Sequence, residues 1–394
     1  LNDGYRIYTS LNQDDQTNLQ NNFENPNLNP VGGDSQAASI VMDAKTGGVR
    51  AVVGGRGEHV FRGFNRATQM YRSPGSTIKP LVDYAPALSR GFSVDSKLKN
   101  QVSSFGTNGY EPHNALDVQT KPVPMYQALE NSYNIPAVWL LDQIGTKVGF
   151  KSAEDAGLPV EKSDDNLSLA IGGMKKGVSP LQMTQAYTSF ANDGKMSKGH
   201  FITKIEDASG KVIVDTKPEQ KRLWSSKVTK EMTSMMLGVY TDGTGVSANP
   251  YGFKVAGKTG TTEVSGEDSS ATNATDSWAI AYTPDVVVTT WMGYDKTDAS
   301  HTLPIYLSQT AGPLMKQTLE QVLPNTPNTP FNVKSVREQM AEKQAAKERQ
   351  AVQGQNANDV SDGITDKIRK GTQDTIDSFN RGAKKAWSDL IGNF

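Results

Sequence analysis

The chain has 394 residues, a formal net charge of −1 and an ordinary composition, with 21% charged and 8% aromatic side chains. Its length suffices to bury a large core, in about two or three units. The near-zero net charge gives no indication of a nucleic-acid partner. The absence of cysteine excludes disulfides and a thiolate zinc site, and it is typical of an extracytoplasmic protein. No apolar run approaches the roughly 18 residues that a membrane span needs.

The first 35 residues are rich in Asn, Gln and Asp and include proline and glycine. This composition predicts a connecting arm with one short strand at about 5–11. Two strands follow at 38–43 and 49–53. They flank Lys45-Thr-Gly-Gly48, a hairpin signal with glycine at the turn.

The middle of the chain carries apolar residues at helical spacing, with glycine or proline between the segments. The helices expected there cover 81–88, 125–132, 136–144, 180–191 and 226–240, and a strand pair covers 201–214. The period then changes to that of strands at 253–262, 277–282 and 286–294, before a last helix at 310–322. Two strands, a helical middle and three more strands predict one domain whose single sheet is closed by both ends of the chain, with helices on its faces. The polar loop 265–276 is either a solvated connection or a gate over a cleft.

A linker rich in proline, asparagine and threonine covers 324–330, and beyond it the composition shifts to Gln, Lys, Glu and Ala. Apolar residues near one helical stripe follow at Ile364, Ile368, Ile376, Phe379, Ala383, Trp387, Leu390 and Ile391. This stripe predicts an amphipathic helix. It either packs on the main domain or contacts a membrane surface.

The stretch Tyr71-Arg-Ser-Pro-Gly-Ser-Thr-Ile-Lys-Pro80 contains a serine and a lysine three residues apart at an expected helix start. Residues at this spacing share one face of a helix, so Lys79 can bring its amine to the hydroxyl of Ser76. A serine needs such a base to become a nucleophile, and a lysine serves only where burial or a second cation disfavours its charge. The hypothesis of a catalytic serine therefore requires another positive group elsewhere in the chain.

Two further motifs supply suitable groups. In Asn131-Ser-Tyr-Asn134, before Pro136, we expect Ser132 and Asn134 on a loop that faces a cleft, where they could relay a proton and bind an amide. In Val255-Ala-Gly-Lys-Thr-Gly-Thr-Thr262, Lys258 could be the second cation, and Thr259 and Thr261 could bind a carboxylate. The glycine-rich loop 241–245 is either part of the site or a plain turn.

The order S-x-x-K, S-x-N and K-T-G is the signature of serine β-lactamases and penicillin-binding proteins. Over about residues 36–325 the chain resembles class A penicillin-binding proteins of Gram-positive bacteria, streptococci in particular. The resemblance implies an α/β (α+β) fold of the serine β-lactamase/transpeptidase type, with an antiparallel five-stranded sheet flanked by helices and a helical subdomain. It implies an interdomain linker arm at 1–35, a penicillin-binding transpeptidase domain at 36–325, and a C-terminal linker and extension at 326–394.

The family mechanism, carried over to matching positions, makes Ser76 the nucleophile and Lys79 its base, and lets Ser132 pass a proton to the leaving nitrogen. Asn134 would hold the substrate amide, Lys258 would set the electrostatic field of the site, and Thr259 and Thr261 would bind the terminal carboxylate of the substrate. Backbone N–H groups of Ser76 and Thr261 would form the oxyanion hole.

The resemblance also implies the partners of the site. Peptidoglycan stem peptides would bind as the D-Ala-D-Ala donor and as the amine acceptor, and β-lactam antibiotics would acylate the serine. The site would lie on the extracytoplasmic face of the bacterial membrane, held by a membrane anchor in the full-length protein that this fragment lacks. No cofactor or metal is implied, and the histidines at 59, 113, 200 and 301 have no ligand spacing.

Three alternatives keep the same motifs. A D,D-carboxypeptidase passes the acyl group to water, and a non-catalytic sensor uses acylation as a signal. A serine β-lactamase needs a carboxylate that activates water for deacylation. The nearest candidate, Glu161, does not match the spacing of that family, and Tyr133 stands where β-lactamases typically have aspartate.

Overall fold

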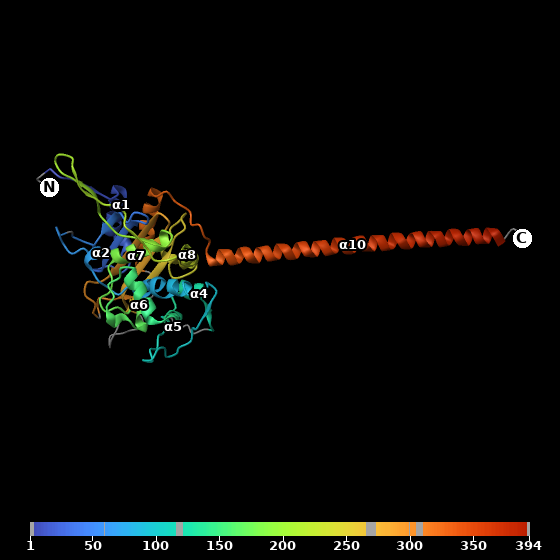
Figure 1. Ribbon diagram of the computed structural model, residues 1–394, viewed down its shortest axis with the longest axis horizontal. Coiled ribbons are helices and arrows are strands. Elements are labelled where there is room, and N and C mark those ends of the chain that lie inside the picture. Colours follow the sequence, from blue (N-terminus) through green and yellow to red (C-terminus); the bar gives the residue numbers. More distant parts are fainter. Residues whose placement is uncertain are drawn as a thin grey trace. The chain divides into compact units, whose positions relative to one another are not determined.

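A computed structural model describes residues 4–58, 60–115, 121–264, 273–298, 300–304 and 310–391. The chain divides into two compact units, Leu1–Val336 and Arg337–Phe394. Residues 337–391 of the second unit belong to one continuous helix, α10 (Val336–Ile391), shown in red in Figure 1. In that helix Ile364, Ile368 and Ile376 are exposed. In the described part of the chain, no helix combines the length and the apolar character that crossing a membrane requires.

The first unit is built around one antiparallel sheet that joins both ends of the domain. Its main path runs in the order β10-β11-β12-β2-β3. The strands are β2 (Gln36–Asp43), β3 (Val49–Val53), β10 (Ala256–Glu263), β11 (Asn273–Tyr282) and β12 (Val286–Gly293). The pairing of β2 with β12 aligns Ser39 with Thr290. The prediction of five antiparallel strands drawn from both halves of the chain is therefore confirmed, except that the short β13 (Leu303–Pro304) adds a sixth strand beside β11.

The other helices and strands connect and cover this sheet. The helices are α1 (Gln13–Glu24), α2 (Arg66–Gln69), α3 (Ala85–Leu88), α4 (Met125–Glu130), α5 (Asn134–Ile144), α6 (Thr146–Asp155), α7 (Pro180–Ala191), α8 (Ser226–Thr241) and α9 (Gly312–Val322). A three-stranded sheet has the order β1 (Arg6–Thr9), β7 (Ile202–Glu206) and β8 (Val212–Asp215). Two smaller pairings join β4 (Lys97–Leu98) to β5 (Val123–Pro124), and β6 (Lys195–Ser197) to β9 (Gln220–Arg222).

Side chains of the sheet alternate between two hydrophobic clusters because successive strand residues point to opposite faces. In β2, Ile40 and Met42 belong to the larger cluster, together with residues of α4, α5, α7 and α8. Val41 belongs to the other cluster, with Leu19 of α1 and Leu314 of α9. The sheet is thus a middle layer, and the helical middle of the chain covers the face that carries the candidate site (Figure 1).

Three sequence predictions need correction. The arm at 1–35 contains α1 as well as the expected short strand, because Asn12 caps the helix and Leu19 and Phe23 bury their side chains. The loop predicted at 265–276 ends earlier, since β11 begins at Asn273, and its residues 265–272 lie outside the described part. The helix expected at 81–88 is divided into a π-helical turn at Pro80–Tyr84 followed by α3.

Candidate active site

Ser76 lies in a short 3₁₀ turn, Gly75–Ile78, that packs against the edge strand β10. Gly75 has φ +50°, and a Cβ at that position would lie 2.6 Å from the backbone oxygen of Thr261. Only glycine suits both the left-handed backbone and this close approach. Pro74 and Gly75, which directly precede Ser76, therefore allow the serine to lie against the K-T-G strand.

The segment before Ser76 is held by a buried ion pair. Arg72 Nε donates to Asp276 Oδ1 over 2.7 Å, and the indole N–H of Trp291 donates to the same oxygen over 2.9 Å. The hydroxyl of Thr275 donates to the other oxygen, Oδ2. The indole of Trp278 donates to the carbonyl oxygen of Ser73 over 2.9 Å. Both oxygens of Asp276 are thus satisfied, and strands β11 and β12 fix the approach to the serine.

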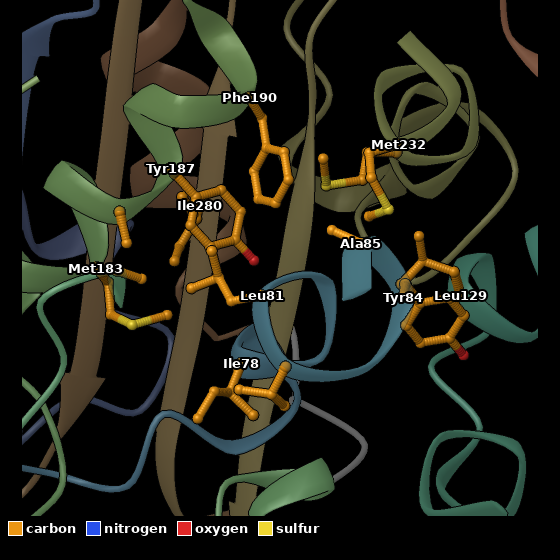
Figure 2. Close-up of a cluster of buried hydrophobic side chains, with 14 of the residues drawn as sticks. Ile78, Leu81, Tyr84, Ala85, Leu129, Met183, Tyr187, Phe190, Met232 and Ile280 are labelled. Carbon is orange, nitrogen blue, oxygen red and sulfur yellow. The ribbon is translucent and has the colours of Figure 1, made fainter. Parts of the chain in front are cut away.

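Buried side chains hold the segment after Ser76. Tyr187 of α7 donates its hydroxyl proton to the carbonyl oxygen of Thr77 over 2.6 Å. Figure 2 shows Ile78, Leu81 and Ala85 in one cluster with Tyr187 and with Met232 of α8. The helical turn that carries Ser76 and Lys79 is therefore a rigid part of the core.

Lys79 is fully buried, and its amine lies at the turn between α4 and α5. Nζ donates to the carbonyl oxygen of Ser132 over 2.7 Å, to that of Tyr133 over 3.1 Å and to Oδ1 of Asn134 over 2.8 Å. Among the described contacts, no hydrogen bond joins Nζ to the hydroxyl of Ser76. The spacing predicted that the Lys79 amine would reach the hydroxyl of Ser76, whereas its hydrogen bonds go to the second motif.

Ser132 connects the two lysines of the motifs. Its carbonyl oxygen accepts from Lys79, and its hydroxyl oxygen accepts from Lys258 Nζ over 2.8 Å. The backbone of Ser132 has φ +58°, which is uncommon for a residue other than glycine. Strain of this kind concentrates at functional sites. All three motifs are thus brought together through Ser132.

Asn134 is the first residue of α5, so the expected loop placement is wrong for it, while Ser132 does lie outside the helices. Pro136 does not break α5, because it lies in the first turn of the helix, where a backbone N–H group would have no hydrogen-bond acceptor within the helix. The start of α5 is capped by Asn114, whose Oδ1 accepts from the backbone N–H groups of Asn134 and Ile135 over 2.8 and 3.1 Å. No sequence pattern indicated that Asn114 supports the second motif.

Thr259 and Thr261 lie on β10, which forms one edge of the sheet. The backbone of Thr261 lies next to Gly75, as the glycine contact requires. The hydroxyl of Thr259 is hydrogen-bonded to that of Thr244, which belongs to the loop 241–245. A Cβ at Gly243 would lie 2.3 Å from the carbonyl oxygen of Glu130. The loop is therefore a close-packed turn that also contacts the K-T-G strand, and the sequence left these two alternatives open.

Burial dominates the electrostatics of both lysines. It lowers the pKa of Lys79 to about 7, and the nearby carboxyl group of Asp83 opposes this shift. Burial also lowers the pKa of Lys258 well below its usual value, and the charge of Lys79 adds to that effect. The sequence indicated Lys258 as the second cation that frees Lys79 from its proton, but desolvation is the main cause. Near neutral pH a lysine with such a pKa can act as a base.

No cluster of three or more metal-ligating side chains occurs in the described ranges. The groups that the site brings together are the hydroxyl of Ser132, two buried amines and an edge strand.

Comparison with known proteins identifies the class to which this site belongs. Residues 37–323 match the family described as the penicillin binding protein transpeptidase domain. Penicillin-binding protein 2a of Streptococcus pneumoniae strain D39 is 41% identical over 410 residues, which cover 100% of this chain and 55% of the relative. Penicillin-binding protein 1F of Bacillus subtilis is 40% identical over 270 residues, or 68% of this chain and 36% of the relative. The chain thus spans about half the length of the first of these relatives and about a third of the length of the second.

Solved structures share the fold. PonA1 of Mycobacterium tuberculosis, in complex with penicillin V, gives a TM-score of 0.72 at 22% identity and covers 85% of this chain and 90% of its own. Penicillin-binding protein A of the same organism, a penicillin G acyl-enzyme complex, gives 0.65 at 20% identity and covers 81% of each chain. This chain belongs to the penicillin-binding protein transpeptidase family. Within it, the chain is the transpeptidase region of a class A member, and the relatives named are from Gram-positive bacteria as predicted.

Proposed function

We propose that this domain is a serine-type D,D-transpeptidase that cross-links peptidoglycan stem peptides on the extracytoplasmic face of the bacterial membrane. The observation that carries the proposal is the meeting of two fully buried lysines at Ser132, beside the turn that holds Ser76. Burying two lysine amines is costly and lowers the pKa of both, and such perturbed groups cluster at functional sites. A purely structural role would not require two of them.

In the first half of the reaction Lys79, as the free amine, takes the proton of the Ser76 hydroxyl. The oxygen attacks the carbonyl carbon of the D-Ala-D-Ala peptide bond, and the backbone N–H groups of Ser76 and Thr261 stabilise the oxyanion. The C–N bond then breaks. Ser132, itself hydrogen-bonded to Lys258, passes its proton to the leaving nitrogen and receives in exchange the proton that Lys79 took from Ser76, and D-Ala departs.

In the second half an amine of a neighbouring stem peptide attacks the acyl-enzyme. It loses a proton to the lysine–serine network, and the new amide bond releases Ser76 with its hydroxyl restored. Asn134 holds the substrate amide, and Thr259 and Thr261 bind the terminal carboxylate. β10 suits this role because an edge strand presents unpaired peptide groups to an extended ligand.

Two of the solved relatives are complexes with penicillin V and penicillin G, the latter an acyl-enzyme. We extend this chemistry to the present chain. A β-lactam would acylate Ser76 and remain bound, because the leaving nitrogen stays tethered to the acyl group.

Two alternatives, a carboxypeptidase and a sensor, share the arrangement and differ in the fate of the acyl-enzyme. The β-lactamase alternative is disfavoured. The nearest candidate from the sequence for activating water, Glu161, is exposed and paired with Lys175 over 2.9 Å.

The first experiment is intact-protein mass spectrometry after mixing with penicillin, with peptide mapping and a time course of adduct loss. We expect one stable adduct on Ser76 that Ser76→Ala abolishes. Ser96→Ala is the matched control, because Ser96 and Lys99 form a second S-x-x-K pattern outside the site. Rapid release of hydrolysed penicillin would identify a β-lactamase, and the absence of any adduct would contradict the assignment of Ser76.

The second experiment offers a stem pentapeptide with and without an acceptor amine and separates the products. A transpeptidase forms the cross-linked dimer, a carboxypeptidase releases D-Ala without a dimer, and a sensor does neither while still forming the penicillin adduct.

A further inference from the structure

We propose that Asp83 is a positioning residue that acts on the Lys79 amine and sets the pH above which Ser76 is acylated. This inference rests on the proposed role of Lys79 as the base. It concerns a residue that lies outside all three motifs and that would touch neither substrate nor Ser76.

Asp83 follows Lys79 by four residues, within the π-helical turn Pro80–Tyr84. Residues at this spacing are neighbours on a helix, and π-helical turns are frequent at functional sites. The side chain of Asp83 is fully buried, and neither of its oxygens has a hydrogen-bond partner. A buried carboxyl group normally finds donors, as Asp276 does, because desolvation without compensation is costly. Without such donors, a buried carboxyl group offsets that cost by holding its proton more tightly or by the attraction of a nearby cation.

Lys79 is that cation. The segments packed against the π-helical turn are α5, α6, the turn Leu167–Ile171 and the flanking helical residues. The ionisable groups that they carry are all partly or fully exposed: Asp142, Lys147, Lys151, Glu154 and Asp155. Lys151 is already paired with Glu154 and Asp155. Tyr84, next in the chain, is buried and has no partner for its hydroxyl. Among the described residues, Lys79 is the buried cation whose charge acts on Asp83.

The two groups influence each other in opposite directions. Burial lowers the pKa of Lys79, and the carboxylate of Asp83 raises it. Burial also raises the pKa of Asp83 well above its usual value, and Lys79 lowers it. The hydrogen-bond acceptors around Nζ are neutral oxygens of residues 132–134, so Asp83 is the group that brings negative charge to the amine. The pair titrates together, and the ammonium form of Lys79 is favoured while Asp83 is ionised.

Without the negative charge of Asp83, only burial acts on the pKa of Lys79, so that pKa falls. Since the free amine is the active form, the acid limb of the acylation rate moves to lower pH. The test variant is Asp83→Asn, which keeps the shape of the side chain. The control is Asp142→Asn, because Asp142 is a carboxyl group on neighbouring α5 that has no part in the pKa shift of Lys79.

The measurement is the second-order rate constant for acylation by penicillin between pH 5 and 9. We expect the acid limb of Asp83→Asn to lie about one pH unit below that of the wild type, which is about tenfold faster acylation on the limb with an unchanged plateau. Asp142→Asn should coincide with the wild type. A loss of packing would lower the rate at every pH. A limb that stays in place in a folded Asp83→Asn protein would overturn the proposal.

A second measurement does not depend on activity. Lysine labelled with ¹³C at Cε allows the Lys79 amine to be titrated by NMR, with Lys79→Arg identifying its signal. We expect a lower titration midpoint in Asp83→Asn, and in Asp83→Ser should the asparagine variant not fold. An unchanged midpoint would overturn the inference. If wild-type Ser76 takes up no penicillin while the midpoint still moves, the proposed function fails and the coupling of Asp83 to Lys79 stands.

Discussion

Two acid–base pairs lie near Ser76: the first contains Arg72, which precedes the serine in the sequence, and the second contains Lys79, which follows it. In the pair before the serine, Arg72 and Asp276, both carboxylate oxygens accept hydrogen bonds and the arginine reaches toward solvent. In the pair after it, Lys79 and Asp83, both side chains are fully buried and the carboxyl group has no donor. The first arrangement fixes a backbone segment. In the second, burial makes the ammonium group of Lys79 lose its proton more easily and makes the carboxyl group of Asp83 hold its proton more tightly.

The largest expected effect breaks the second pair on its basic side. Lys79→Ala removes the proposed base, so the rate of acylation by penicillin should fall by about 10²- to 10⁴-fold. Lys99→Ala, in the other S-x-x-K pattern, should acylate at the wild-type rate. A folded Lys79→Ala protein with a normal acylation rate would show that another group is the base.

The next effect tests the first pair as a structural clamp. Asp276→Ala leaves the Arg72 guanidinium without its partner, and we expect a loss of about 3 kcal/mol in the free energy of unfolding, measured by denaturant titration. Asp295→Ala is the control. Asp295 also pairs with an arginine, Arg66, but is more than half exposed, so its removal should cost about 1 kcal/mol or less. Equal losses of unfolding free energy in the two variants would contradict the proposed structural role of the Arg72–Asp276 pair.

A smaller effect concerns the glycine that lies between the two pairs. Gly75→Ala forces an L-residue into a left-handed backbone and places its Cβ against Thr261, so we expect a loss of about 2 kcal/mol in stability and slower acylation. Gly91→Ala has a similar backbone requirement with no atom within 4 Å of its Cβ. The difference in unfolding free energy between the two variants reports the cost of the contact between residue 75 and Thr261. No difference is expected if the turn does not pack closely against β10.

The pH dependence of the wild type gives the next effect. In the proposed mechanism the Lys79 amine acts only without its proton. Because burial lowers its pKa to about 7, acylation should slow as the pH falls below about 7. The expected slope is about tenfold per pH unit, since the free amine fraction falls at that rate. Initial rates between pH 5 and 8 decide the matter, and a rate that is flat across this range would rule out Lys79 as the titrating base.

The smallest effect is expected far from either pair. Glu161→Gln removes a partly exposed ion pair with Lys175, so stability should change by about 0.5 kcal/mol or less, and the lifetime of the penicillin adduct should be unchanged. A longer-lived adduct in this variant would revive the β-lactamase alternative.

The sequence predicted the parts of this molecule that local patterns encode. The central sheet, α7 and α8 were predicted with their approximate bounds, because apolar periodicity and capping residues mark them. The helix α1 was missed because its 12 residues are mostly polar and only Leu19 and Phe23 among its apolar side chains are buried. Its stability also depends on Asp15, which pairs with Arg50 across 35 positions of the chain.

The same limit applies to the site. Ser76, Ser132 and Lys258 were found because each lies in a short motif. The supports of the site lie far away in the sequence, as Asp276 does from Arg72 across 204 positions and Asn114 does from Asn134 across 20. Asp83 is close to Lys79 in the sequence, but no pattern reveals that its carboxyl group lacks a donor. That fact depends on the packing of several helices.

The closure of the sheet by both ends of the domain also governs the order in which the molecule can fold. Ser39 of β2 meets Thr290 of β12, its partner 251 positions later, so a chain synthesised from its amino end must wait for that strand. The helices between them form from local contacts, while the long-range pairing is slow and leaves apolar strands exposed. Because β10 and β11 belong to the same late sheet, the turn that holds Ser76 gains its contacts with the K-T-G strand only when that sheet forms.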